Sequence, residues 1–175
     1  VVLFSDIDGT LVDKSMQVSA GDRRAIADFM ARGFYFSLAT GRGRTNAEFH
    51  VHDLASNFPA IFANGATLYD RVADRSILEY DLPTAGLSRL FDLMKAFYPE
   101  IMIQVYQPDA IYLVSDSPDS DPRVAEHHPF VRADFAGMEG GRATKVLFGM
   151  TDENCDEGQL IANAFVEANF PELRV

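Results

Sequence analysis

The sequence has one cysteine, no excess of positive charge and no long apolar run, and each of these shortages excludes a class of protein. The single cysteine, Cys155, cannot build a disulfide framework, and its acidic neighbours disfavour the thiolate that thiol catalysis needs. Lys and Arg total 15 against 26 Asp and Glu, giving a net charge of -11, which repels nucleic acids and anionic membranes. No apolar run is long enough to span a bilayer. We therefore expect a cytoplasmic protein without nucleic-acid or membrane partners.

Apolar residues, in contrast, are plentiful. They make up 47% of the 175 residues, and aromatic residues make up 11%, which is enough to build the core of one ordinary domain or of two small domains. Val1 already belongs to an apolar run, and Leu173–Val175 resembles the start of a strand. We therefore expect the chain to be part of a longer protein.

The first 65 residues alternate between strand-like and helix-like patterns. Val1–Phe4 predicts a strand buried on both faces, because it is apolar without polar alternation. Ser19 and Asp22 form a helix-start pattern, and Gly33 marks the end of that helix. The next expected elements are a strand at 34–39, a helix within 45–55 and a strand at 60–63. This order predicts an α/β fold with a parallel sheet.

The second half has a mixed α+β pattern. We place the boundary after Asp81, giving a first domain at 1–81 and a second at 82–175. The expected elements are a hairpin at 67–80, a helix with an apolar stripe of Leu87, Leu90, Phe91, Met94 and Phe97, strands at 101–106, 110–114 and 145–150, a loop at 116–122, and a helix with a stripe of Leu160, Ile161, Ala164, Phe165 and Ala168. The core of this half is expected to include the aromatic residues Phe130, Phe135, Tyr106 and Tyr112, and the alternative is that one or two of them face a substrate cleft.

Polar clusters follow each of the first three predicted strands. They are Asp6–Thr10, Thr40–Arg42 and Asn64–Gly65. Because ligands of parallel sheets bind beyond the carboxyl ends of the strands, the three clusters predict one site.

The cluster after the first strand carries the chemistry. Asp6 is ionised at neutral pH and can attack phosphorus, while Asp8 can move a proton. Gly9 lets the backbone turn its N–H groups toward an anion. A weak carboxylate nucleophile needs a hard cation beside it, which predicts Mg2+. The alternatives are a solvated turn and a calcium loop, but a calcium loop would need an acidic residue where Gln17 stands.

Three motifs resemble a known family. Asp6–Leu11 reads D-I-D-G-T-L, Leu38–Arg42 reads L-A-T-G-R, and Asn64–Ala66 reads N-G-A. In this order and spacing they resemble the Cof-type phosphatases of the haloacid dehalogenase superfamily. The resemblance covers Val1 to about Tyr80, and the later part is consistent with the large cap of that subfamily. It implies a Rossmann-like core with an inserted α+β cap.

By this resemblance, Asp6 would form an aspartyl-phosphate, and Asp8 would protonate the leaving alcohol and then activate water. The Asp6 carboxylate and the Asp8 backbone carbonyl would bind Mg2+. The residues implied in phosphate binding are Gly9, Thr10, Thr40, Gly41 and Arg42. Asn64 is a possible substrate contact, and the alternative is that it only shapes its turn.

Alternatives stay open at two of these positions. Thr40 could instead cap the following helix. Arg42 could meet an anionic end of the substrate or lie on the surface.

Other ionisable groups are weaker candidates. His50 and His52 do not share a helix face, and His127 and His128 precede a proline, so neither pair predicts a metal site. Lys145 opens a strand in the second half, a setting that argues against a catalytic lysine. Asp152, Glu153 and Asp156 read as a solvated helix start.

The family's late lysine and late acidic motif have no counterpart in this sequence, so we expect the 175-residue chain alone to bind Mg2+ poorly and to hydrolyse phosphate esters slowly or not at all. We predict a Mg2+-dependent phosphatase for small phosphorylated metabolites such as sugar phosphates. The alternatives are a catalytically incomplete fragment, a non-catalytic binding protein with the same fold, and a phosphomutase.

Overall fold

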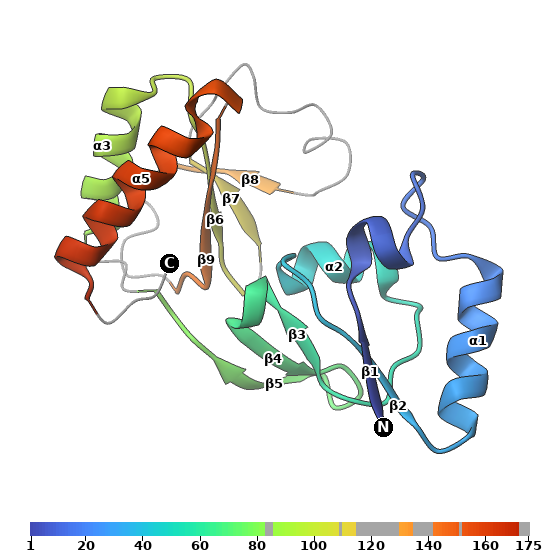
Figure 1. The fold of residues 1–175 in the computed structure, drawn as a ribbon. Coiled ribbons are helices and arrows are strands. Elements are labelled where there is room, and N and C mark those ends of the chain that lie inside the picture. The colour runs from blue at the N-terminus through green and yellow to red at the C-terminus, as the bar shows by residue number, and fades with distance from the viewer. Residues whose placement is uncertain (83–85, 109, 115–129, 135–141, 151, 172–175) are drawn as a thin grey trace. The chain divides into compact units, whose positions relative to one another are not determined.

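The computed structural model describes residues 1–82, 86–108, 110–114, 130–134, 142–150 and 152–171 (Figure 1). Contacts divide the chain into two compact units, one made of residues 1–81 with 108–110 and the other of 82–107 with 111–175. Within the described ranges, no helix is both long enough and apolar enough to cross a membrane.

The first unit is built on parallel strands joined by helices. Its elements are β1 (Val2–Ser5), α1 (Ala20–Ala31), β2 (Tyr35–Leu38), α2 (Arg44–Val51) and β3 (Ala60–Phe62). β1 pairs with β2 in parallel, and a parallel bridge between Ala39 and Ile61 joins the end of β2 to β3. The predicted order of strand, helix, strand, helix and strand is confirmed, and so is the parallel sheet.

Helix α1 begins and ends as the sequence predicts. The Ser19 hydroxyl accepts a hydrogen bond from the backbone N–H of Asp22 (3.0 Å) and donates to the Asp22 carboxylate (2.6 Å). The first of these bonds satisfies a backbone donor that the first turn of a helix leaves without a partner, and the second holds the hydroxyl in place. Gly33 follows the helix with φ +83°, a left-handed conformation that glycine adopts without a steric penalty.

The chain then turns back on β3 as a hairpin. β4 (Thr67–Asp70) pairs antiparallel with β3 and with β5 (Arg75–Glu79), so these strands form a sheet in the order β3-β4-β5. The hairpin expected at 67–80 is therefore confirmed.

The core of this unit lies between the sheet and its helices. Its fully buried side chains include Ile7, Phe36, Leu38, Val51 and Phe62. They come from the β1 loop, β2, α2 and β3, so the core holds each motif-bearing segment against the others.

The predicted burial of β1 is wrong for this structure. The exposed fractions of Val2, Leu3 and Phe4 are 40%, 47% and 39%. Among the described residues β1 pairs only with β2, so no described segment continues the sheet past β1. The apolar pattern identified the strand correctly, but it could not show which segment covers it.

The second unit is an antiparallel-rich sheet covered by two helices. Its elements are α3 (Leu87–Phe97), β6 (Met102–Tyr106), β7 (Ile111–Leu113), β8 (Phe130–Arg132), β9 (Lys145–Gly149) and α5 (Asp152–Asn169). The strand order is β8-β7-β6-β9, with β7 and β8 parallel and the other pairs antiparallel. Helices α3 and α5 lie side by side against the sheet (Figure 1).

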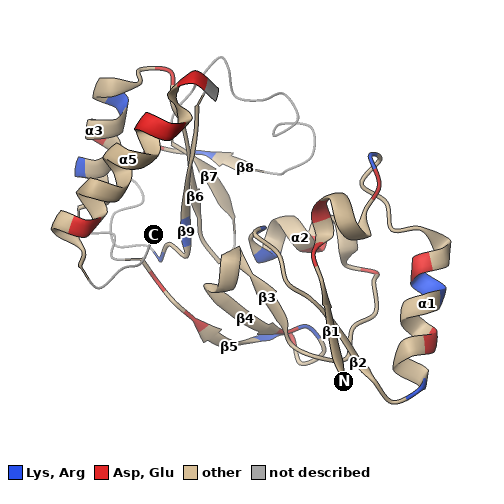
Figure 2. Cartoon of the chain, viewed as in Figure 1, with Lys and Arg blue, Asp and Glu red and all other residues tan. Residues whose placement is uncertain are grey.

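Acidic residues occur on α1, α2, α3 and α5, so the negative charge is distributed over both units (Figure 2).

Two predicted helix faces need correction. On α3, Leu87, Leu90, Phe91 and Met94 are buried as expected, but Phe97 is 59% exposed. On α5, Leu160 is 69% exposed, while the packed side chains are Ile161, Ala162, Phe165 and Val166. Apolar residues lie on more than one side of α5. Their spacing alone therefore fitted two neighbouring faces of the helix, and the buried face is shifted by one residue from the predicted one.

The core assignment in this half is confirmed for Tyr106, which is buried, and for Tyr112, which packs against the core cluster. The loop expected at 116–122, together with His127, His128 and Phe135, lies outside the described residues.

Candidate active site

The ends of three strands meet at one edge of the first unit. The backbone N–H of Ala39 donates to the carbonyl of Ser5 (2.9 Å), which joins the end of β2 to the end of β1. The N–H of Thr40 donates to the carbonyl of Ile61 (3.0 Å), and the N–H of Asn64 donates to the carbonyl of Thr40 (3.2 Å). The structure thus brings together the three polar segments predicted from the sequence.

The loop after β1 carries its polar residues on two apolar anchors. Ile7 and Leu11 are 0% and 8% exposed, whereas Asp6, Asp8 and Gly9 are exposed. The Asp6 carboxylate accepts a hydrogen bond from the backbone N–H of Ile7 (2.7 Å). Gly9 has φ +65°, a conformation that favours glycine. The buried anchors fix the loop, so both carboxylates have defined positions at its surface.

Arg42 holds Asp8 through a two-bond ion pair. Its Nε donates to Oδ2 of Asp8 (2.7 Å) and its Nη2 donates to Oδ1 (2.6 Å). Its Nη1 donates to the side-chain oxygen of Asn46 (2.7 Å), which is 3% exposed. The Arg42 side chain is only 10% exposed, so it does not lie free on the surface. Paired bonds from a planar guanidinium set the orientation of a carboxylate as well as its charge environment.

Thr40 is buried beside this ion pair. It is 6% exposed, and its hydroxyl oxygen accepts a hydrogen bond from the backbone N–H of Arg42 (3.2 Å). The helix-cap alternative for Thr40 is wrong, because α2 begins at Arg44 and its cap position is Gly43. A hydroxyl that accepts through its oxygen still carries a proton to donate.

The turn after β3 has an unusual backbone. Ala63, Asn64 and Gly65 have φ values of +51°, +57° and +100°. Asparagine and glycine tolerate this left-handed region, whereas alanine incurs a cost of about 1 kcal/mol or more there. The turn is tied to the site, because the N–H of Ala63 donates to the carbonyl of Arg42 (2.8 Å). The left-handed backbone of Asn64 (φ +57°) thus fits the role of shaping this turn.

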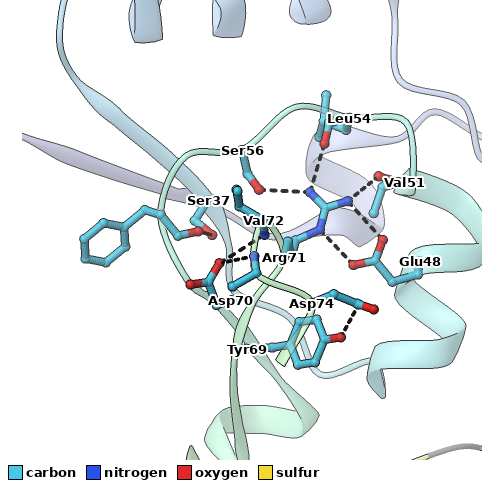
Figure 3. Close-up of polar contacts among 12 residues, drawn as sticks. Ser37, Glu48, Val51, Leu54, Ser56, Tyr69, Asp70, Arg71, Val72 and Asp74 are labelled. Carbon is cyan, nitrogen blue, oxygen red and sulfur yellow. Dashed lines mark hydrogen bonds and ion pairs between the residues drawn. The ribbon is translucent and has the colours of Figure 1, made fainter. Parts of the chain in front are cut away.

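The far end of α2 is fixed by Arg71 (Figure 3). The guanidinium donates to both carboxylate oxygens of Glu48 (2.7 and 3.0 Å) and to the carbonyls of Val51 (2.8 Å) and Leu54 (2.9 Å). It also donates to the hydroxyl of Ser56 (3.0 Å). Its side chain is 7% exposed. One buried cation thus satisfies the carbonyls at the end of the helix and connects them to the β4–β5 turn.

A cavity of about 340 Å³ lies beside this network, and Arg44, Glu48, Tyr69, Arg71 and Asp74 are among its lining residues. Burial, together with the hydrogen bond from the Tyr69 hydroxyl to Asp74, raises the pKa of Tyr69 above its usual 10.0. The Arg44 guanidinium lies 4.9 Å from the centre of the Tyr69 ring. Three charged residues of the cavity, Glu48, Arg71 and Asp74, are thus bonded to other lining residues.

Metal-binding groups are sparse. Within the described part of the chain, no three His, Cys, Asp or Glu residues gather closely enough to hold a metal ion by themselves. Asp6 and Asp8 bring two carboxylates to the site.

Sequence reasoning missed Asn46, Glu48 and Arg71. Asn46 and Glu48 lie within the segment predicted to be helical. In the sequence, the two polar residues on either side of Ala47, which the structure shows to be buried, were the only sign of their specific contacts. Arg71 lies in a predicted turn, where a charged residue is ordinarily exposed. Nothing in the sequence alone connects Arg71 with Glu48.

Comparison with known proteins gives a consistent assignment. A family model described as haloacid dehalogenase-like hydrolase matches residues 3–169. A Bacillus subtilis protein named as a 5-amino-6-(5-phospho-D-ribitylamino)uracil phosphatase is 32% identical over 99 residues, which is 55% of this chain and 33% of that protein. The chain thus aligns with about a third of the length of this curated relative.

Solved structures share the fold. A phosphatase of the haloacid dehalogenase superfamily from Bacteroides thetaiotaomicron matches with a TM-score of 0.74 at 19% identity, covering 92% of this chain and 60% of that one. A sugar phosphatase of subclass IIB in the same superfamily matches with a TM-score of 0.75 at 17% identity, covering 93% and 63%. At these identities the likeness establishes the fold, a Rossmann-like core with a second α+β unit.

Proposed function

The chain belongs to the haloacid dehalogenase-like hydrolase family, and from this membership we propose that it hydrolyses small phosphomonoesters with Asp6 as the nucleophile. The observation that carries the proposal is the placement of Asp6 and Asp8 on an anchored loop beside Thr40, at the carboxyl edge of a parallel sheet. Parallel sheets bind ligands at this edge.

In the first step, an Asp6 carboxylate oxygen attacks phosphorus and forms an aspartyl-phosphate. The bond between phosphorus and the ester oxygen breaks, and the departing alcohol takes a proton from the Asp8 carboxyl group. The bond from the Ile7 N–H supports this role, since it restrains the Asp6 carboxylate before the reaction.

In the second step, a water molecule attacks the phosphorus of the aspartyl-phosphate and gives a proton to Asp8. Inorganic phosphate leaves and the Asp6 carboxylate is restored, so the protons balance over the two steps. Asp8 must face the leaving oxygen first and the water later. The paired bonds from Arg42 hold the Asp8 carboxylate in one plane, and an ionised carboxylate is the form that accepts the proton of water in this second step.

The same edge offers donors for the phosphoryl oxygens. We assign phosphate binding to Gly9, Thr10, Thr40, Gly41 and Arg42. Thr40 is supported by its hydroxyl proton beside the loop, and Arg42 by its positive charge, which offsets the charge of the phosphate. Asn64 is proposed as a substrate contact from the turn after β3.

Mg2+ is the proposed cofactor. Hard oxygen donors suit this ion, which needs only one or two carboxylates and keeps several waters. The Asp6 carboxylate and the Asp8 backbone carbonyl fit that demand, because both belong to the anchored loop. When bound, Mg2+ would offset charge on the phosphoryl oxygens.

The proposed substrate is a small phosphorylated metabolite. Two relatives carry names that specify a phosphorylated ribityl compound and sugar phosphates, which supports testing both classes. We propose that the second unit, residues 82–175, acts as the cap that selects among them. The net charge of -11 supports the absence of nucleic-acid and anionic-membrane partners, and the lone exposed Cys155 supports a cytoplasmic location.

The decisive assay is phosphate release from a panel of sugar and sugar-alcohol phosphates, with and without Mg2+. Asp6→Asn removes the nucleophile while keeping the size of the side chain, so we expect release to fall to background. Asp28→Asn makes the same change at an exposed position of α1 and serves as the matched control, with unchanged release. Mass spectrometry of the quenched reaction should show a phosphoryl group on Asp6.

Release that persists in Asp6→Asn would show that another group is the nucleophile. Release that is indifferent to Mg2+ would overturn the cofactor assignment but leave the nucleophile in place.

A further inference from the structure

We propose that Asn46 is a positioning residue that fixes the Arg42 guanidinium and, through it, the orientation of Asp8. The catalytic consequence of this inference rests on the proposed function, whereas its structural part does not. Asn46 lies on α2 and is 3% exposed, and its side-chain oxygen accepts a bond of 2.7 Å from Nη1 of Arg42.

The geometry gives Asn46 control over the plane of the guanidinium. Arg42 uses Nε and Nη2 for Asp8 and Nη1 for Asn46. A guanidinium is planar and rigid, so bonds on two of its edges fix its plane, and that plane then fixes the carboxylate on the other edge. With the Asn46 bond removed, the guanidinium could rotate about its long side chain, so its paired bonds to Asp8, including the one from Nε, would break and re-form more often.

Asn46 itself is held firmly. Its neighbours Ala47 and Val51 on α2 are fully buried in the core of the first unit. Arg71 bonds Glu48 on the same helix and the carbonyl of Val51 at its end. The helix therefore offers Asn46 as a fixed acceptor, and burial of the amide excludes the water that would otherwise replace it.

Asp8 is the side chain for which this restraint matters. It is half exposed, so water competes for its oxygens, and the paired bonds from Arg42 are the restraint on its orientation that Asn46 can influence. Proton transfer is slower when the position of the donor varies, because the reacting atoms must lie within about 3 Å of each other and be aligned. A loosened Asp8 should thus slow turnover while leaving substrate binding nearly intact.

The test uses the 175-residue chain and compares two replacements. Asn46→Leu keeps the side-chain size and removes the acceptor, whereas Asn46→Asp keeps an acceptor oxygen at the same place. Asn57→Ala is the matched control, because among the described residues the Asn57 side chain bonds the start of β2 and the residue before it, at the N–H of Phe36 (2.8 Å) and the carbonyl of Phe34 (3.0 Å). Asn46→Ala replaces the leucine variant if circular dichroism shows that the latter is unfolded.

The first measurement needs no activity. Solvent exchange of the Arg42 Nε–H is followed by nuclear magnetic resonance, with the signal assigned by its loss in Arg42→Lys. We expect exchange about tenfold faster in Asn46→Leu, since a hydrogen bond to a charged group is worth about that factor or more. The Asn46→Asp and Asn57→Ala variants should keep the exchange rate of the unmodified chain. Unchanged exchange in the folded one of these two variants, Asn46→Leu or its replacement Asn46→Ala, would overturn the proposal.

The second measurement is turnover of the best phosphomonoester found for the chain. We expect kcat about tenfold lower in Asn46→Leu with KM within a factor of about two, and recovery in Asn46→Asp. A rise in KM alone would assign Asn46 to substrate binding and refute positioning. If neither the variants nor the unmodified chain hydrolyses any ester, the proposed function fails for this 175-residue chain, and the exchange measurement still decides whether Asn46 positions Arg42.

Discussion

Replacing Arg71 by methionine should destabilise the first unit more than any change on its surface. The substitution keeps an apolar stem and removes the guanidinium that bonds Glu48, Val51, Leu54 and Ser56. Glu48 would retain its charge at a side-chain exposure of 24%, the Leu54 carbonyl would lose its bond from the guanidinium, and the Val51 carbonyl would keep only the Leu54 N–H (3.0 Å).

The expected size of the effect follows from those losses. Removing one partner of a buried ion pair costs about 3–5 kcal/mol. Glu48 is partly exposed, so water recovers some of that loss and the lower end, about 3 kcal/mol, is expected. In the Glu48→Gln background the same Arg71→Met change should cost less, because no charge is left behind, and the difference between the two costs should be about 1–2 kcal/mol.

Urea unfolding followed by circular dichroism gives the free energy of unfolding, and hydrogen exchange of residues 44–56 assigns the change to α2. Arg24→Met on the exposed side of α1 is the control and should change stability by less than about 0.5 kcal/mol. An Arg71→Met chain as stable as the Arg24→Met chain would refute the view that Arg71 fixes the end of α2.

Two further predictions concern the first unit. Ser19→Ala should lower its stability by about 1 kcal/mol, measured by urea unfolding, because the N–H of Asp22 loses its acceptor, and an unchanged midpoint would show that the cap contributes nothing. Asp74→Asn should lower the pKa of Tyr69 toward 10.0 in an ultraviolet titration, although burial, the larger cause, keeps it raised. Because the folded pKa of Tyr69 is raised, its contribution to stability is complete below pH 10.0 and is lost as pH rises through the folded pKa, so the loss of stability in alkali should be smaller in Asp74→Asn.

Local patterns predicted the elements of the first unit because each pattern acts over a few residues. Ser19 and Gly33 marked the limits of α1, and Asp6 and Thr40 marked the ends of two strands. Parallel pairing then forces strand ends to one edge, which is why the three polar segments could be expected to meet.

The partnerships within the site could not be predicted in this way. Arg42 and Asp8 are 34 positions apart, and Arg71 and Glu48 are 23 apart. Which carboxylate an arginine selects depends on the path of the backbone between them, and the sequence pattern does not contain that path. The same limit explains why β1 was recognised as a strand while its exposure was not.

The exposed face of β1 has a consequence for the behaviour of this chain in solution. An apolar strand with an edge that no described segment pairs is a surface on which strands of other molecules can assemble. The net charge of -11 opposes such encounters by mutual repulsion, and dissolved salt shortens the reach of that repulsion to about 10 Å at 0.1 M. Colloidal stability of the 175-residue chain should therefore decline as ionic strength rises, so dilute buffers are the appropriate medium for handling it.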